Sequence, residues 1–125
     1  MQQVVIFIAV GSAAALTHLV TVAFLVEFFA LPPLVANIFG FGAAFLVSFG
    51  GHARWTFPIA PERLQTARHR FFAVACAGFL FNQLAYAEML HLVGARYYLP
   101  ALAAVLLAVA VSTFLLSKLW AFAEP

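Results

Sequence analysis

Residues 4–29 read VVIFIAVGSAAALTHLVTVAFLVEFF, an apolar run whose only formal charge is Glu27. A helix that crosses the hydrocarbon of a bilayer needs about 20 such residues. The run is too long and too uniformly apolar for a strand of a membrane barrel. Because a spanning segment must satisfy its own backbone groups where there is no water, the run predicts a transmembrane helix. Leu31-Pro32-Pro33 ends it, since proline cannot continue a helix.

Three further runs have the same character, at about 34–51, 71–93 and 99–116, and their only formal charge is Glu88. The 125-residue chain is 66% hydrophobic and 8% charged, with a mean hydropathy of +1.08. Soluble domains are nearer half apolar and a quarter charged, and so small a globule could not bury this much apolar surface. This composition excludes a soluble enzyme, a disordered chain and a nucleic-acid binder. The predicted fold class is an all-α membrane protein with four transmembrane helices.

Basic residues indicate the orientation. The loop at 52–70 holds four arginines, Arg54, Arg63, Arg68 and Arg70. Lys118 follows the fourth span, whereas the short loop between spans three and four has only Arg96. Because Lys and Arg collect on the cytoplasmic side, we expect the 52–70 loop and both termini to be cytoplasmic. Trp55 and Trp120 then lie at the level of the aromatic belt.

The chain resembles two copies of one unit at an offset of 64 residues. Phe7-Ile8-Ala9-Val10 matches Phe71-Phe72-Ala73-Val74, and His18 falls opposite Asn82. Arg54 matches Lys118, and the Trp-x-Phe that follows Arg54 recurs at 120–122. We predict one transmembrane domain, 1–125, built from two hairpin repeats of parallel topology. They cover about 4–57 and 71–122, with a basic cytoplasmic loop at about 58–70 between them.

Spans two and four each carry small residues four apart, Gly40, Ala44 and Ser48 in one and Ala104, Ala108 and Ser112 in the other. Such stripes let helices approach closely in lipid. We expect both stripes to pack within the chain rather than to form a dimer seam.

Four polar side chains within the spans are candidates for a shared seam, His18, Asn37, Asn82 and Tyr86. Polar residues in a bilayer are costly and are functional candidates by default. The seam could meet the hydroxyls of a sugar, or it could only hold the helices together by hydrogen bonds. Glu27 and Glu88, toward the outer helix ends, are either interfacial carboxylates in contact with water or a proton-coupling site.

Arg54 and Lys118 either bind a phosphate beside Trp55 and Trp120 or serve as positive-inside anchors. The chain contains no Asp, no set of Ser, His and acid, no spacing of metal ligands and no glycine-rich phosphate loop. We therefore expect no enzymatic activity, no metal and no cofactor.

Taken together, these motifs resemble the GtrA-like family of small four-span membrane proteins. The residues that carry the resemblance are Phe7-Ile8-Ala9-Val10-Gly11, Ala36-Asn37, Ser48-Phe49, Arg54-Trp55-Thr56-Phe57, Phe71-Phe72-Ala73-Val74, Asn82 and Lys118-Leu119-Trp120-Ala121-Phe122. The family usually reads Asn-Arg-x-Trp-x-Phe after its even-numbered spans, whereas in this chain Arg54 directly precedes Trp55. Here His52 and Ser117 occupy the two Asn positions.

The resemblance implies flipping of polyprenyl-phosphate-linked sugars, such as undecaprenyl phosphate-glucose, across the bacterial cytoplasmic (inner) membrane for cell-surface polysaccharide synthesis. On this reading Arg54 and Lys118 bind the phosphate, Trp55 and Trp120 set its depth and stack on sugar, and the seam residues meet hydroxyls. Membrane lipids and a homo-oligomer are the other expected partners. Two alternatives remain, a membrane anchor or assembly partner of a glycosyltransferase and a small proton-coupled multidrug exporter.

Overall fold

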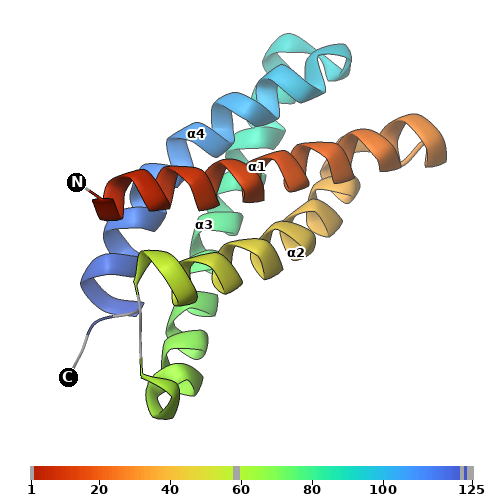
Figure 1. Ribbon diagram of the computed structural model, residues 1–125. Coiled ribbons are helices and arrows are strands. Elements are labelled where there is room, and N and C mark those ends of the chain that lie inside the picture. Colours follow the sequence, from red (N-terminus) through yellow and green to blue (C-terminus); the bar gives the residue numbers. More distant parts are fainter. Residues whose placement is uncertain (1, 58–59, 122, 124–125) are drawn as a thin grey trace.

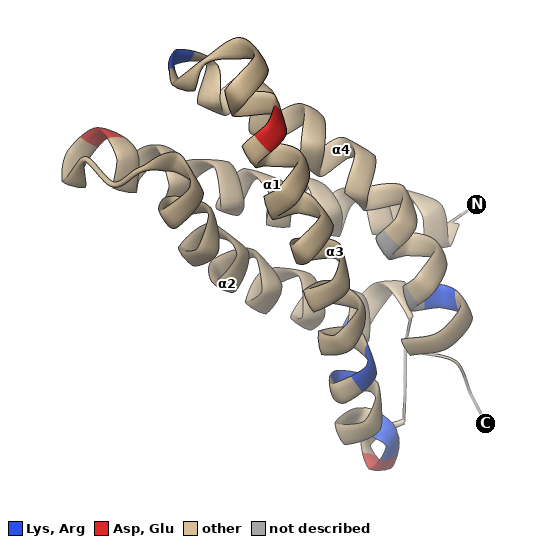
Figure 2. Ribbon diagram, turned by 180° about the vertical axis from the view of Figure 1, so that it is seen from behind, with Lys and Arg blue, Asp and Glu red and all other residues tan. Residues whose placement is uncertain are grey.

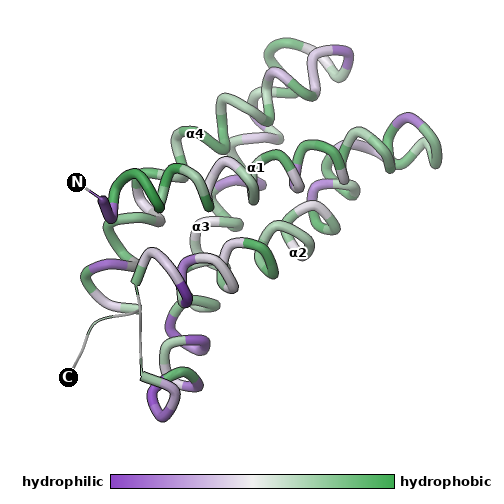
Figure 3. Tube along the Cα trace, viewed as in Figure 1, coloured by the Kyte–Doolittle hydropathy of each residue, from purple (hydrophilic) through white to green (hydrophobic). Residues whose placement is uncertain are grey.

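The protein is a bundle of four long helices, and the computed structural model describes residues 2–57, 60–121 and 123 (Figure 1). The helices are α1 (Gln2–Phe29), α2 (Pro33–Gly51), α3 (Leu64–Val93) and α4 (Tyr98–Leu116). All four are long and apolar enough to cross a membrane, and the described residues include no strand. The predicted all-α membrane fold is therefore confirmed. Figure 3 shows that hydrophobic residues dominate along every helix.

Both hairpins turn on a residue with left-handed backbone geometry. Ala30 has a φ of 56° and Gly94 has a φ of 92°, and the two positions are related by the 64-residue offset. After α1, the N–H of Ala30 donates to the carbonyl of Val26 at 3.1 Å, which is the hydrogen bond of an αL cap. Pro33 then supplies the fixed φ that suits the start of α2.

The two even-numbered helices each continue into one π-helical turn. These turns are η1 (His52–Thr56) and η4 (Ser117–Ala121), and each contains a basic residue and a tryptophan. Ala53 of η1 and Ala121 of η4 are buried in one cluster with Phe71 of α3. The two turns therefore meet at the end of the bundle that holds both chain termini (Figure 1).

The basic segment between the hairpins is more helical than its composition indicates. After the 3₁₀ turn η2 (Pro61–Arg63), α3 already begins at Leu64, inside the stretch expected as a loop. The Arg70 guanidinium lies 5.6 Å from the Trp120 ring centre and donates to the Trp120 carbonyl at 3.3 Å. Figure 2 shows that most basic residues gather at this end of the bundle.

The two small-residue stripes behave differently. A Cβ at Gly40 would lie 2.6 Å from Cδ2 of His18, so glycine allows α1 and α2 to approach closely. The equivalent stripe of α4 is exposed at Ala104, Ala108 and Ser112. The expectation of packing within the chain is correct for Gly40 and wrong for the α4 stripe, because α4 packs through its Ala101, Leu102 and Val105 face instead.

Candidate functional site

A buried network of polar side chains joins three helices, near the middle of α1, near the start of α2 and in the second half of α3. His18 of α1 lies with Nε2 2.6 Å from Oδ1 of Asn37 on α2. The Asn37 amide nitrogen donates to Oδ1 of Asn82 and to Oε1 of Gln83, both on α3 and both at 2.7 Å. His18, Asn37 and Asn82 are each at least 96% buried. Polar groups this far from water are stabilised only when they are hydrogen-bonded to one another.

The direction of each hydrogen bond follows from one backbone carbonyl. The Gln83 amide nitrogen donates to the carbonyl oxygen of Leu34 at 3.0 Å, and that oxygen can only accept. The Gln83 Oε1 atom must then accept from the Asn37 amide, which leaves Asn37 Oδ1 facing His18. His18 Nε2 must therefore carry the proton that it donates, and the neutral ring keeps Nδ1 as an acceptor.

Two polar atoms of this network have no hydrogen-bond partner among the described residues, Nδ1 of His18 and Nδ2 of Asn82. One is an acceptor and the other is a donor. Both side chains line a cavity of about 150 Å³ in the interior of the bundle. The two residues therefore bring one unused acceptor and one unused donor to the lining of the cavity, and a hydroxyl group can serve either kind of atom.

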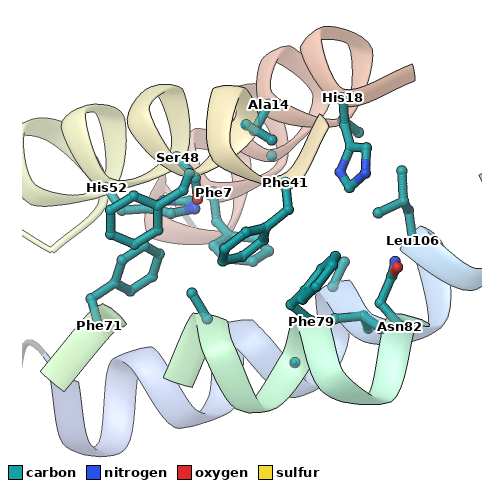
Figure 4. Close-up of a pocket in the computed structure, with 18 residues that line it drawn as sticks. Phe7, Ala14, His18, Phe41, Ser48, His52, Phe71, Phe79, Asn82 and Leu106 are labelled. Carbon is teal, nitrogen blue, oxygen red and sulfur yellow. The ribbon is translucent and has the colours of Figure 1, made fainter. Parts of the chain in front are cut away.

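The cavity runs between all four helices and is mostly aromatic and apolar (Figure 4). Phe41 and Phe79 are both part of the lining and pack against each other, with ring centres 4.6 Å apart. The lining residues are Phe7, Gly11, Ala14, Ala15, His18, Phe41, Ala44, Phe45, Ser48, His52, Phe71, Ala75, Gly78, Phe79, Asn82, Leu106, Val109 and Ala110. None of these residues is an acid, a lysine or an arginine.

The odd-numbered helices contribute to the cavity symmetrically. Every residue of α1 in the lining has a counterpart in α3 at the 64-residue offset. The pairs are Phe7 with Phe71, Gly11 with Ala75, Ala14 with Gly78, Ala15 with Phe79 and His18 with Asn82. Two repeats related by an axis through the cavity would give this arrangement. The duplication itself stays a prediction.

At the other end of the cavity, Ser48 and His52 are the polar lining residues. His52 is 1% exposed, and its ring stacks on Phe7 with centres 4.8 Å apart and planes 13° apart. Its Nδ1 atom lies 2.9 Å from the hydroxyl of Thr56. Figure 4 shows this pair at the end opposite to His18 and Asn82.

Tyr86 belongs to the interior but not to the network. It is fully buried, and its hydroxyl donates to the backbone carbonyl of Tyr98 at 2.8 Å. Thr17 and Thr21 donate to carbonyls of their own helix, at 2.8 and 2.7 Å. These hydroxyls are therefore satisfied without a ligand.

The two acidic candidates lie away from the cavity. Glu27 is exposed, and its Oε2 accepts a hydrogen bond of 2.6 Å from the hydroxyl of Tyr98, which ties the end of α1 to the start of α4. Glu88 is exposed, and within the described part of the chain it has no hydrogen bond or ion pair. Neither residue lines the cavity.

The candidate phosphate residues lie on the two π-helical turns. Arg54 and Trp55 are exposed on η1, and Lys118 and Trp120 are exposed on η4. The Lys118 amine lies 5.8 Å from the ring centre of Phe114. All four residues lie outside the cavity lining, at the end of the bundle nearest its Ser48 and His52 end.

Sequence reasoning missed Gln83 and His52 as site residues. Gln83 follows Asn82 directly inside a span, so its polarity alone was a usable signal. His52 is noted only as a departure from the family motif, and nothing local in the sequence places it against Phe7.

The comparison with protein families gives one match. The model described as the GtrA/DPMS transmembrane domain matches residues 6–122, which is nearly the whole chain. Comparisons with curated proteins and with solved structures gave no match.

Proposed function

The chain belongs to the GtrA/DPMS transmembrane-domain family, and from this premise we propose that it moves polyprenyl-phosphate-linked sugars across the bacterial cytoplasmic membrane. The sugars would serve cell-surface polysaccharide synthesis. Both termini would face the cytoplasm, since the basic residues gather at that end. The chain would act without a chemical reaction or cofactor of its own.

The observation that carries the proposal is the polar network beside an uncharged cavity. A sugar that crosses hydrocarbon loses the hydrogen bonds that its hydroxyls make with water, and this loss is one part of the barrier to crossing. Among the residues that the structure describes, nothing occupies the acceptor of His18 or the donor of Asn82, and both residues line the cavity. The polyprenyl tail would stay in lipid while these atoms replace part of the lost hydration.

The exposed cations support the same proposal at the membrane surface. Arg54 and Lys118 would bind the phosphate, with Trp55 and Trp120 holding the headgroup at the interface. Because four helices enclose little volume, the proposal includes a homo-oligomer. It also includes an associated glycosyltransferase that supplies the substrate.

The test is a transport assay in proteoliposomes. Purified protein is reconstituted with polyprenyl phosphate-glucose, and the sugar in the outer leaflet is measured by its access to an added glycosidase. We expect faster transfer than in protein-free vesicles, and slower transfer with Asn82→Leu. The matched control is Thr21→Val, whose hydroxyl is bound within its own helix. No acceleration for any polyprenyl-phosphate sugar would refute the proposal.

A further inference from the structure

We infer that Ser48 and His52 form a second sugar-binding position, separate from the one at His18 and Asn82. We call Ser48 and His52 the loop-side pole, and His18 and Asn82 the network pole. The inference rests on the proposed function and adds where in the cavity the sugar binds. The ligand class is a single uncharged ring that bears hydroxyl groups.

The loop-side pole has the unused hydrogen-bonding atoms that a ligand needs. Thr56 occupies Nδ1 of His52, and Nε2 of the same ring has no partner in residues 2–57, 60–121 and 123. The Ser48 hydroxyl also lacks a hydrogen bond to any described residue. His52 is 1% exposed, so water at the surface does not satisfy Nε2. A buried polar atom without a partner is costly, and here it belongs to a residue that lines a cavity.

The two poles are too far apart for one sugar ring to touch both. His52 of η1 stacks on Phe7 of α1. His18 lies farther along α1, where it packs against Gly40 of α2. A rise of about 1.5 Å per residue places Phe7 and His18 about 16 Å apart along the helix. A hexose is shorter than this distance, so the poles are successive positions along one path.

The lining between the poles suits a sugar ring in transit. Five phenylalanines line the cavity, Phe7, Phe41, Phe45, Phe71 and Phe79. Their faces offer apolar surface to the C–H face of a ring, while the poles serve its hydroxyls. A volume of about 150 Å³ is that of an internal cavity that binds benzene, so there is room for no more than one ring at a time. The lining has no formal charge to pair with an anionic sugar.

The experiment uses a photoreactive alkyl β-glucoside, with its diazirine on the carbon next to the sugar, and the full chain in lipid nanodiscs. Labelled peptides are mapped by mass spectrometry. Three competitors are compared, octyl glucoside, octyl glucuronide and a cyclohexyl alkyl ether without hydroxyls. We expect labelling near Phe7 and in residues 41–57, with octyl glucoside competing better than the charged or hydroxyl-free compound.

Variants at Ser48 and His52 then test whether the preference for octyl glucoside depends on the loop-side pole. His52→Phe keeps a ring against Phe7 and removes both nitrogens, and Ser48→Ala removes only the hydroxyl. We expect each to weaken competition by octyl glucoside roughly three- to tenfold, as the loss of one or two hydrogen bonds would. Thr56→Val is the matched control, because it removes the partner of Nδ1 and keeps the His52 ring with both its nitrogens.

The inference is overturned if octyl glucoside competes equally well in the wild type, Ser48→Ala and His52→Phe. It is also overturned if Thr56→Val weakens the competition as much as these variants do, because His52 would then only hold η1 in place. Ser48→Ala decides the question if His52→Phe does not fold. Binding at this pole without transport in proteoliposomes would refute the proposed function alone. Transport without binding at this pole would refute this inference alone.

Discussion

Replacing Asn37 by leucine tests how much the polar network contributes to the bundle. The substitution keeps the side-chain size and removes three hydrogen bonds, to His18, Asn82 and Gln83. Interhelical hydrogen bonds in membranes average about 0.6 kcal/mol, so their loss alone costs about 2 kcal/mol. The polar atoms left without partners add to this, and we expect a total of about 2 to 4 kcal/mol.

The measurement is the free energy of unfolding of the purified protein in bicelles, by steric trapping. Thr21→Val is the control, with an expected change within about 0.5 kcal/mol, because its hydroxyl bonds only its own helix. The double variant Asn37→Leu/Asn82→Leu should cost less than the sum of the single variants, since the two amides share a hydrogen bond. If Asn37→Leu is no more destabilising than Thr21→Val, the network does not hold the helices together and the reasoning fails.

Four further substitutions, one of them a control, test the backbone geometry by the same unfolding measurement. Gly40→Ala should destabilise by about 1 to 3 kcal/mol, because its Cβ would lie 2.6 Å from His18, whereas Gly42→Ala has nothing within 4 Å and should be close to neutral. Equal effects of these two variants would contradict the packing. Ala30→Gly should stabilise by about 1 kcal/mol, because alanine is strained at a φ of 56°. Gly94→Ala should destabilise by about 1 to 3 kcal/mol, and a neutral result would rule out the φ of 92° at that turn.

The site could be predicted only in part from the sequence. Polarity inside the spans identified His18, Asn37 and Asn82, because few polar residues occur there. Polarity alone did not indicate which of these side chains would form hydrogen bonds with one another. Asn37 proved to be the centre of the network, and Tyr86, on the same face of α3 as Asn82, bonds elsewhere. A partner across helices depends on how each helix is rotated, and no short-range pattern encodes that rotation.

The sequence by itself determined the number of spans and the short turn inside each hairpin, but not the start of α3 at Leu64. Uniform apolarity over about 20 residues requires a helix in lipid, and Pro32-Pro33 and Gly94 mark the ends of the first and third spans. Only the tertiary structure decided which face of each helix points inward. In a soluble helix a polar face marks the outside, but here lipid-facing and buried residues are equally apolar. The aromatic cavity, the position of His52 against Phe7 and the exposed stripe of α4 therefore became visible only once the helices were packed together.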